Sequence, residues 1–187
     1  MRANAFEERK EINFLSSNED SWIIRDIMEI RTATIADLAQ IAAVEAECFP
    51  VAEAATKEEF AERIKYYGNH FWLMFEDEKL IAFVDGFVTD KPDLADEMYE
   101  KAEMHDENSA WQMIFGVNTI PAYRKHGYAG QLLQCAIEDA RKQGRKGLVL
   151  TCKEKLIAYY TKFGFVNEGI SESVHGNVIW YQMRYKF

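Results

Sequence analysis

The sequence predicts a mixed α/β domain, and two observations support this fold class. Short apolar runs such as His70–Glu76 and Leu148–Cys152 predict buried strands. Segments with apolar residues at every third or fourth position alternate with these runs and predict amphipathic helices. Of the 187 residues, 48% are hydrophobic and 13% are aromatic, so the chain can bury a core.

Glycine, proline and turn residues separate the elements expected in the first half of the domain. Pro50 ends the first helix, Gly68 follows the second, and Asp77-Glu78 joins two strands as a short hairpin. The expected order is a strand at 29–32, a helix from Thr34 or Asp37 to about Glu47, a helix at 57–67, and strands at 70–76 and 80–89.

The second half begins after an acidic stretch at 90–107 that holds eight acidic residues and two lysines. A helix that runs to about Lys142 and ends before Gly144 places its apolar residues on one face, namely Leu132, Leu133, Ala136, Ile137 and Ala140. The other expected elements are a buried strand at 111–118, a polar turn at 121–130, a central strand at 148–152, a short helix at 156–163, and strands at 165–174 and 177–185 that pair around His175-Gly176.

Charge and composition argue against several classes of partner. The chain has 22 basic and 31 acidic residues, a net charge of −9. Nonspecific nucleic-acid binding and attachment to an anionic membrane both need basic surfaces, so neither partner is expected. No apolar run is long enough to span a bilayer, and the first residues, MRANAFEERKEINF, have no signal-peptide core.

The cysteines and the N-terminal residues bear on location and domain limits. Cys48, Cys135 and Cys152 form neither a metal pattern nor a disulfide framework, so we expect a cytoplasmic protein with reduced thiols and no metal. Residues 1–27 are polar and are interpreted as an arm that is poorly ordered. The domain is expected at 28–187.

The most informative segment is the turn Arg124-x-x-Gly127-x-Ala129, which links a buried strand to an amphipathic helix. The first N–H groups of a helix have no internal partner, and the helix dipole adds positive charge there. Small residues let a phosphate approach the backbone closely. No Gly-Lys-Ser/Thr follows, and the spacing is not that of a dinucleotide fingerprint. The turn therefore predicts an anion site of another kind.

The order of motifs resembles the Gcn5-related N-acetyltransferase (GNAT) superfamily. The Arg-x-x-Gly-x-Ala turn is similar to its acyl-CoA-binding motif, and AYYTKFGF resembles its Tyr-x-x-Phe-Gly-Phe segment. The segments ECFP, LIAFVDGFV and HGNVIWYQM are similar to arylalkylamine N-acetyltransferase-like proteins. The resemblance covers about residues 28–187 and implies a mixed, mostly antiparallel central sheet with helices on both faces.

The resemblance also implies acetyl-CoA as cofactor, with CoA as product. Its pantetheine arm would lie between the strand at 111–118 and the strand at 147–152, and main-chain groups of 125–130 would hold its pyrophosphate. A main-chain N–H near Val117 would polarise the acetyl carbonyl. The implied cofactor-binding residues are Val117, Asn118, Thr119, Arg124, Lys125, His126, Gly127, Tyr128, Ala129 and Gly130. Lys153 stands where many relatives carry asparagine, which is a departure from the pattern.

The implied reaction is direct attack of an amine on the acetyl thioester. Tyr160 matches the tyrosine that the family places near the sulfur, as a proton donor, and Tyr159 is expected to face the core. The paired histidines of the arylalkylamine enzymes correspond to Met113 and Phe115, which do not titrate. The base is therefore open.

Two residues and two other mechanisms are the alternatives for that chemistry. The base could be Glu47 at the end of the first helix, His175 in the last hairpin, or a water chain without a dominant base. Cys152 suggests an acyl-cysteine intermediate, although a buried cysteine usually serves packing.

The expected acceptor is a primary amine of a small molecule. The acidic stretch 90–107 is either a solvated surface or a border of the acceptor site that attracts a cationic amine. The alternatives are a protein or peptide amine, a longer acyl-CoA, or an acyl-CoA-binding sensor with little turnover. A homodimer is compatible with all of these readings.

Overall fold

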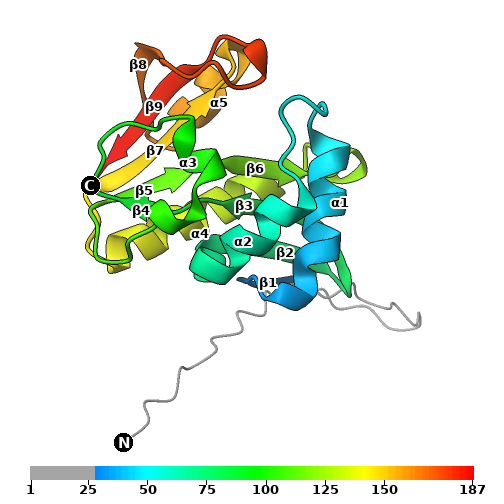
Figure 1. Ribbon diagram of the computed structural model, residues 1–187. Helices are drawn as coiled ribbons and strands as arrows, with labels where there is room; N and C mark the ends of the chain where they lie inside the picture. Colours follow the sequence, from blue (N-terminus) through cyan, green and yellow to red (C-terminus); the bar gives the residue numbers. More distant parts are fainter. Residues whose placement is uncertain (1–27) are drawn as a thin grey trace, which may run out of the picture.

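The computed structural model of the chain describes residues 28–187 and has two sheets with helices on both sides (Figure 1). The expectation of an N-terminal arm at 1–27 lies outside the described residues. None of the helices in 28–187 combines the length and the apolar character that crossing a membrane requires.

The first sheet is antiparallel throughout, and its strands follow the order β1-β2-β3-β6. The second sheet has the order β4-β5-β7-β9-β8, and only its β5–β7 pair is parallel. The mixed, mostly antiparallel architecture predicted for the chain is thus confirmed. The strands are β1 (Met28–Thr32), β2 (Phe71–Glu76), β3 (Lys79–Asp85), β4 (Val88–Thr89), β5 (Trp111–Ile114), β6 (Gly116–Thr119), β7 (Gly147–Cys152), β8 (Val166–Ile170) and β9 (Tyr181–Lys186).

The predicted helices are present at the expected places. In Figure 1, α1 and α2 stand in front of the first sheet, and α4 lies behind it. A capping box begins α2, because the Thr56 hydroxyl accepts the Glu59 N–H and the Glu59 carboxylate accepts the Thr56 N–H. The α-helices are α1 (Leu38–Cys48), α2 (Lys57–Tyr67), α3 (Glu97–Glu100), α4 (Tyr128–Lys142) and α5 (Ile157–Thr161).

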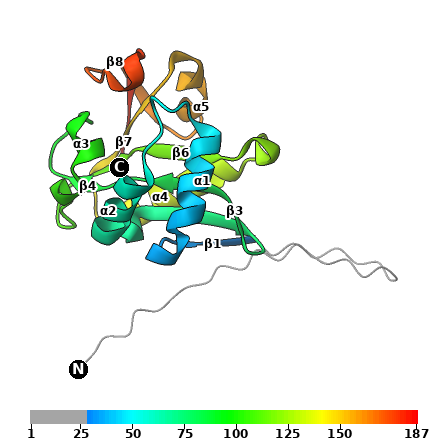
Figure 2. The same ribbon diagram turned by 45° about the vertical axis from the view of Figure 1, so that its right-hand side comes forward.

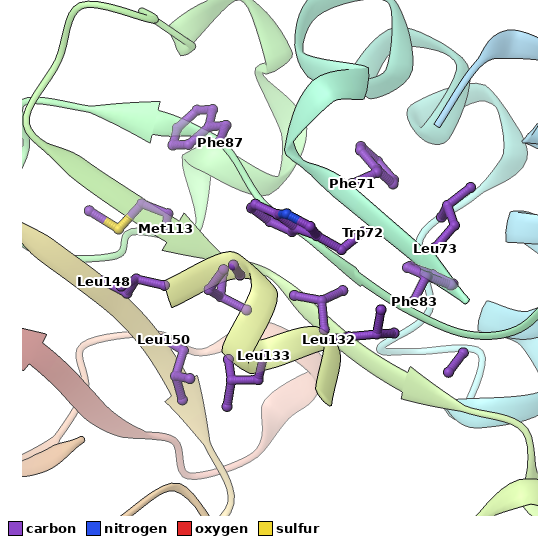
Figure 3. Close-up of a cluster of buried hydrophobic side chains, with 14 of the residues drawn as sticks. Phe71, Trp72, Leu73, Phe83, Phe87, Met113, Leu132, Leu133, Leu148 and Leu150 are labelled. Atoms are coloured by element: carbon purple, nitrogen blue, oxygen red, sulfur yellow. The ribbon is translucent and has the colours of Figure 1, made fainter. Parts of the chain in front are cut away.

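The apolar face of α4 joins the two sheets into one core. Figure 3 shows Leu132 and Leu133 of α4 among side chains of the first sheet, such as Trp72 and Phe83, and of the second sheet, such as Leu150. All five residues predicted for that face are at most 2% exposed. Because this one face packs against both sheets, it fixes the position of the helix N-terminus relative to them.

Two strands predicted as continuous are each broken, and the breaks create the two sheets. The run 80–89 ends as β3 at Asp85 and resumes as β4 at Val88. A Cβ on Gly86 would lie 1.8 Å from the Met113 carbonyl oxygen, so only glycine allows the two chain segments to cross here. The run 111–118 breaks at Phe115, between β5 and β6. Apolar continuity in the sequence does not reveal such breaks.

The sequence analysis predicted that the last two strands pair around His175-Gly176, and this prediction is wrong. Their ladder ends at Ile170↔Tyr181, and residues 171–180 form a loop. The loop has its own supports, because Trp180 Nε1 donates to the His175 carbonyl at 2.8 Å and the Val174 N–H donates to Asp96 at 2.9 Å. The loop therefore reaches over the acidic stretch instead of closing as a tight turn.

Candidate active site

The two sheets separate at one point and leave an open strand edge. β5 pairs with β7 as far as Ile114↔Leu150, and then β6 turns away to pair with β3. The Ile120 N–H donates to the Ile81 carbonyl of β3 at 3.0 Å. Because backbone groups alternate in direction along a strand, those of Val117 and Thr119 point to the other side, where β6 has no partner strand in the described part of the chain. This edge can pair with amides of an extended ligand.

The turn before α4 presents an open cradle of main-chain groups. Gly127 has φ +85° and caps the helix, and no atom lies within 4 Å of the place where its Cβ would stand. Lys125 also has positive φ, at 69°. The first helical hydrogen bond runs from the Gln131 N–H to the Gly127 carbonyl at 3.0 Å, so the N–H groups of 128–130 have no partner within the helix. The turn fits a pyrophosphate.

Polar side chains of this turn bind the backbone around it. Arg124 Nε donates to the Thr119 carbonyl at 3.0 Å, so that carbonyl already has a donor. The His126 ring stacks on Tyr128 with centroids 5.7 Å apart and lies 3.2 Å from the Tyr123 carbonyl. These contacts hold the shape of the turn, and the exposed main chain remains available to an anion.

Gly130 and Asn118, two of the residues expected to bind the cofactor, have different structural roles. A Cβ on Gly130 would lie 2.8 Å from the Phe163 ring, so glycine lets α4 approach the chain after α5. Asn118 pairs with Phe83 in the ladder, and its side-chain amide donates to Glu45 Oε2 at 2.9 Å. Neither its backbone nor its amide faces the open edge, so its expected place among the cofactor contacts gains no support from this geometry and stays a prediction.

A cavity of about 330 Å³ opens where the strands separate. Its walls come from α1, the α1–α2 loop, α2, α3, the separated strands, α5 and the β8–β9 loop. Besides aromatic rings, the walls contain one guanidinium, that of Arg63, and six carboxylates: Glu45, Glu53, Glu59, Asp85, Asp96 and Glu100. Three residues of the stretch 90–107 thus border the pocket: Asp96, Tyr99 and Glu100.

Glu45 is the acid that the sequence reading missed. It is 6% exposed and accepts the Ala55 N–H at 3.1 Å in addition to the Asn118 amide. Burial, reinforced by the charge of Asp85, raises the pKa of Glu45 to about 7. Glu47, the predicted candidate, is exposed on α1 and does not line the pocket. The signal was present, because Glu45 stands four residues after the buried Ile41, on the same helix face.

A second buried carboxylate, that of Asp85, also lines the pocket. Asp85 is 1% exposed, and its Oδ2 is 3.3 Å from a terminal nitrogen of Arg63. Burial raises the pKa of Asp85 to about 6, although the Arg63 cation opposes this. Arg63 also donates to the Tyr99 carbonyl at 3.0 Å. The charge of Arg63 therefore stabilises the ionised forms of two carboxyl groups, Asp85 and Glu45. Because one cation cannot neutralise two anions, full ionisation of both is unfavourable.

The two tyrosines of α5 differ in their surroundings, and only Tyr160 lines the pocket. Tyr160 is 6% exposed and lines the pocket, and burial raises its pKa, so its phenol is protonated at neutral pH. Tyr159 is half-buried and packs edge-on against Phe163, with centroids 5.2 Å apart. Tyr160 is thus the one that can present a proton to the pocket.

His175 and Cys152 also line the pocket, in environments that limit their chemistry. His175 Nε2 lies 3.1 Å from the Glu53 carbonyl, and its ring stacks on Tyr99 with centroids 5.0 Å apart. Cys152 is 1% exposed, and burial raises its pKa to about 11. A thiol that resists ionisation is a poor nucleophile, so an acyl-cysteine intermediate loses support.

Within residues 28–187, one group of side chains of the kind that can bind a metal ion lies away from the pocket: His70, His105 and Glu107. His105 Nδ1 accepts the Val88 N–H at 3.1 Å, which places the proton of a neutral ring on Nε2, next to Glu107. Arg145 also pairs with Glu107, at 2.5 Å. Hydrogen bonds and ion pairs within the group therefore account for these side chains without a metal ion.

Comparison with known proteins shows the family to which this chain belongs. The profile of the Acetyltransferase (GNAT) family matches residues 38–165, more than half of the chain, and the chain belongs to that family. The family comprises acyl-CoA N-acyltransferases, so the protein is an enzyme of this class and acetyl-CoA is its cofactor. The open edge of β6 and the cradle at Gly127 fit that cofactor.

Three solved structures illustrate the likeness in fold. The GNAT-like decarboxylase GphF in complex with isobutyryl-CoA has a TM-score of 0.72 and 20% identity over 84% of this chain and 98% of its own. The ribosomal-protein-S18-alanine N-acetyltransferase from Escherichia coli has 0.63 and 18% over 85% and 93%. The PaiA N-acetyltransferase from Thermoplasma acidophilum in complex with coenzyme A has 0.64 and 19% over 86% and 99%. At these identities the likeness shows the fold alone.

Proposed function

We propose that the enzyme transfers the acetyl group of acetyl-CoA to the primary amine of a small molecule by direct attack in a ternary complex. The observation that carries this proposal is the 330 Å³ pocket at the strand separation, with six carboxylates on its walls and Glu45 among them. A negative pocket concentrates cations, and an amine in neutral water is an ammonium ion.

A small acceptor is favoured because two loops are tied together at the pocket wall. Lys153 Nζ, after β7, donates to Glu53 Oε1 of the α1–α2 loop at 2.8 Å. His175 of the β8–β9 loop lies 3.1 Å from the Glu53 carbonyl. In Figure 2 the loop after α1 rises to the region of α5 and β8. A polypeptide acceptor would have to pass between these joined loops, whereas a small amine fits beneath them.

The GNAT-like decarboxylase GphF has a similar fold, and the pocket argues against decarboxylation in the present enzyme. The substrate of a decarboxylase carries a carboxylate, which leaves as carbon dioxide while the rest of the acyl group remains. The six carboxylates of this pocket would repel such a group, with Arg63 as the one guanidinium among the lining residues. The charge of the pocket favours an amine acceptor and a neutral acetyl donor. The finer likeness to arylalkylamine transferases stays a prediction.

Glu45 is the base in this proposal. An alkyl ammonium has a pKa of about 10.4 in water, so few molecules are nucleophilic at pH 7. A carboxyl group with a pKa of about 7 is half ionised there and can accept the proton, directly or through water. Asn118 and the Ala55 N–H hold the carboxylate in place.

Val117 and Tyr160 complete the proposed roles. The outward N–H of Val117 donates to the acetyl oxygen as negative charge develops on it. Tyr160 gives its proton to the departing sulfur as the new N–C bond replaces the C–S bond. The ammonium loses two protons in all: one passes through Glu45 to solvent, and the other restores Tyr160 through solvent. Acetyl-CoA supplies the activated acetyl group.

A thiol-release assay with a panel of small amines and N-terminal peptides tests this function. We expect release of CoA with at least one small amine at a higher kcat/KM than with any peptide. Calorimetric binding of CoA without thiol release by any acceptor would instead indicate a sensor. A peptide that outperforms the small amines would transfer the proposal to protein acetylation.

A further inference from the structure

Glu53 carries a buried oxygen that has no partner. Its side chain is 7% exposed, and Oε1 accepts from Lys153. Oε2 is buried without a hydrogen bond, and among the carboxylate oxygens of residues 28–187 it is the one in this condition. A buried charged group that lacks a donor is unfavourable, because it has lost water without gaining a hydrogen bond. Because Glu53 lines the pocket, a bound molecule can supply that donor.

Glu53 and Glu45 lie on opposite sides of the strand separation. Glu45 contacts Asn118 on β6, whereas Glu53 contacts Lys153 at the end of β7. The same loop supports both, since the Ala55 N–H binds Glu45 and Ala55 is two residues from Glu53. Both carboxylates also line the same cavity of about 330 Å³, so one short molecule in that cavity can contact both.

We propose that the acceptor is a short aliphatic diamine, with one nitrogen delivered to Glu45 for acetylation and the other held as an ammonium by Oε2 of Glu53. This inference rests on the proposed function and names its substrate class. The reacting nitrogen gives its proton to Glu45 and becomes neutral, so it no longer needs an anion. The distant nitrogen keeps its charge throughout and supplies the donor that Glu53 lacks.

The rest of the wall suits the same ligand. Tyr99, His175 and Trp180 line the pocket, and the Tyr99 and His175 rings are stacked in series. Aromatic faces attract ammonium groups and also pack against methylene chains. The Trp180 ring already makes a cation–π contact, because Lys153 Nζ lies 5.6 Å from its centroid. The pocket thus offers carboxylates for both ends of a diamine and apolar surface for its chain.

The test compares putrescine with butylamine, which has the same carbon chain and one nitrogen fewer. We expect the wild-type enzyme to use putrescine with a kcat/KM at least about tenfold higher, mainly through KM, because the pair with Glu53 is charge-assisted. Glu53→Gln keeps an acceptor for Lys153 and removes the charge. It should lower the putrescine-to-butylamine ratio of kcat/KM by about tenfold. Glu58→Gln, an exposed acid on α2, is the matched control and should leave the ratio as it is.

A second variant gives the opposite sign and serves if Glu53→Gln does not fold. Lys153→Met frees Oε1 of Glu53 while keeping an apolar chain beside Trp180, so the preference for putrescine should increase. Equal use of the two amines by the wild type, or a Glu53→Gln variant that retains the wild-type ratio, would overturn the diamine proposal alone. Absence of thiol release with either amine and with the rest of the panel would overturn the proposed function instead.

Discussion

The side-chain amide of Asn118 donates a 2.9 Å hydrogen bond to Glu45, and this contact joins the cofactor strand to the acid of the acceptor pocket. Asn118 Oδ1 is buried without a partner. A Cβ on Gly116 would lie 3.1 Å from Asn118 Nδ2 and 2.5 Å from Asp85 Oδ1. Glycine therefore brings the amide and both carboxyl groups together, and the protonation of Glu45 depends on this arrangement.

Glu45→Gln tests the base. The variant cannot accept a proton, so kcat at pH 7 should fall by about 10²–10⁴-fold, while CoA affinity stays close to the wild-type value. In the wild type, kcat/KM should rise with pH through about 7, where Glu45 ionises. Stopped thiol-release assays across pH 5–9, within a buffer series of constant ionic strength, measure both effects. Retention of the acidic limb in Glu45→Gln would assign the base to another group.

Asp85→Asn tests how the pKa of that base is set. Asp85 raises the pKa of Glu45, and Arg63 lowers it. Removing the Asp85 charge should therefore move the acidic limb of the pH profile to lower pH, by about one unit. An acidic limb at the wild-type position would show that the two carboxyl groups titrate independently.

Gly127→Glu should abolish measurable CoA binding in calorimetry. The new carboxylate would occupy the open cradle at the helix N-terminus and repel the pyrophosphate. Gly144→Glu is a matched control, since Gly144 also has positive φ, at 73°, and open space at its Cβ position. Both variants carry similar backbone strain, so normal CoA affinity in Gly127→Glu would contradict the assigned turn.

Tyr160→Phe should lower turnover by roughly 10²-fold and change CoA affinity little, because the ring keeps its packing and only the proton donor is lost. Tyr159→Phe removes a hydroxyl from the adjacent residue, which does not line the pocket, and serves as the control. Equal rates for the two variants would return Tyr160 to a packing role.

Glu107→Gln addresses stability away from the pocket. Partial burial raises the pKa of Glu107. The interactions with His70, Asn69 and Arg145 outweigh this effect and lower the pKa to about 2. A carboxyl group with a depressed pKa stabilises the fold above its unfolded-state value and loses this effect as the pH falls toward 2. We expect a loss of about 1 kcal/mol at pH 7, because Glu107 is about half exposed. The difference in Tm from the wild type should narrow below pH 4, and a constant difference would refute the assignment.

The sequence predicted the fold well because its helices carry strong local signals. The α2 helix has a capping box and a following glycine, and α4 has a complete apolar face, so both occur where expected. The breaks at Gly86 and Phe115 were missed, because they depend on contacts between segments distant in the chain. The local pattern of apolar residues does not indicate where two distant chain segments cross.

The site was predictable in part for the same reason. The turn at Gly127 and the position of Tyr160 follow from local motifs. The base proposed here did not, because Glu45 gains its raised pKa from burial and from Asp85, which is forty residues away in the chain. The helix pattern did place Glu45 on the inward face with Ile41, and a charged residue there is unusual enough to identify a functional candidate.

The separation of β6 from β7 leaves a donor slot whose hydrogen-bonding groups belong to the main chain. Any residue that tolerates an extended backbone supplies the same groups, so this slot is largely insensitive to mutation. The acceptor walls, in contrast, consist of side chains on loops. Evolution can therefore exchange acceptors by rewriting those loops while inheriting the donor slot intact, which is consistent with folds that persist at 20% identity or less.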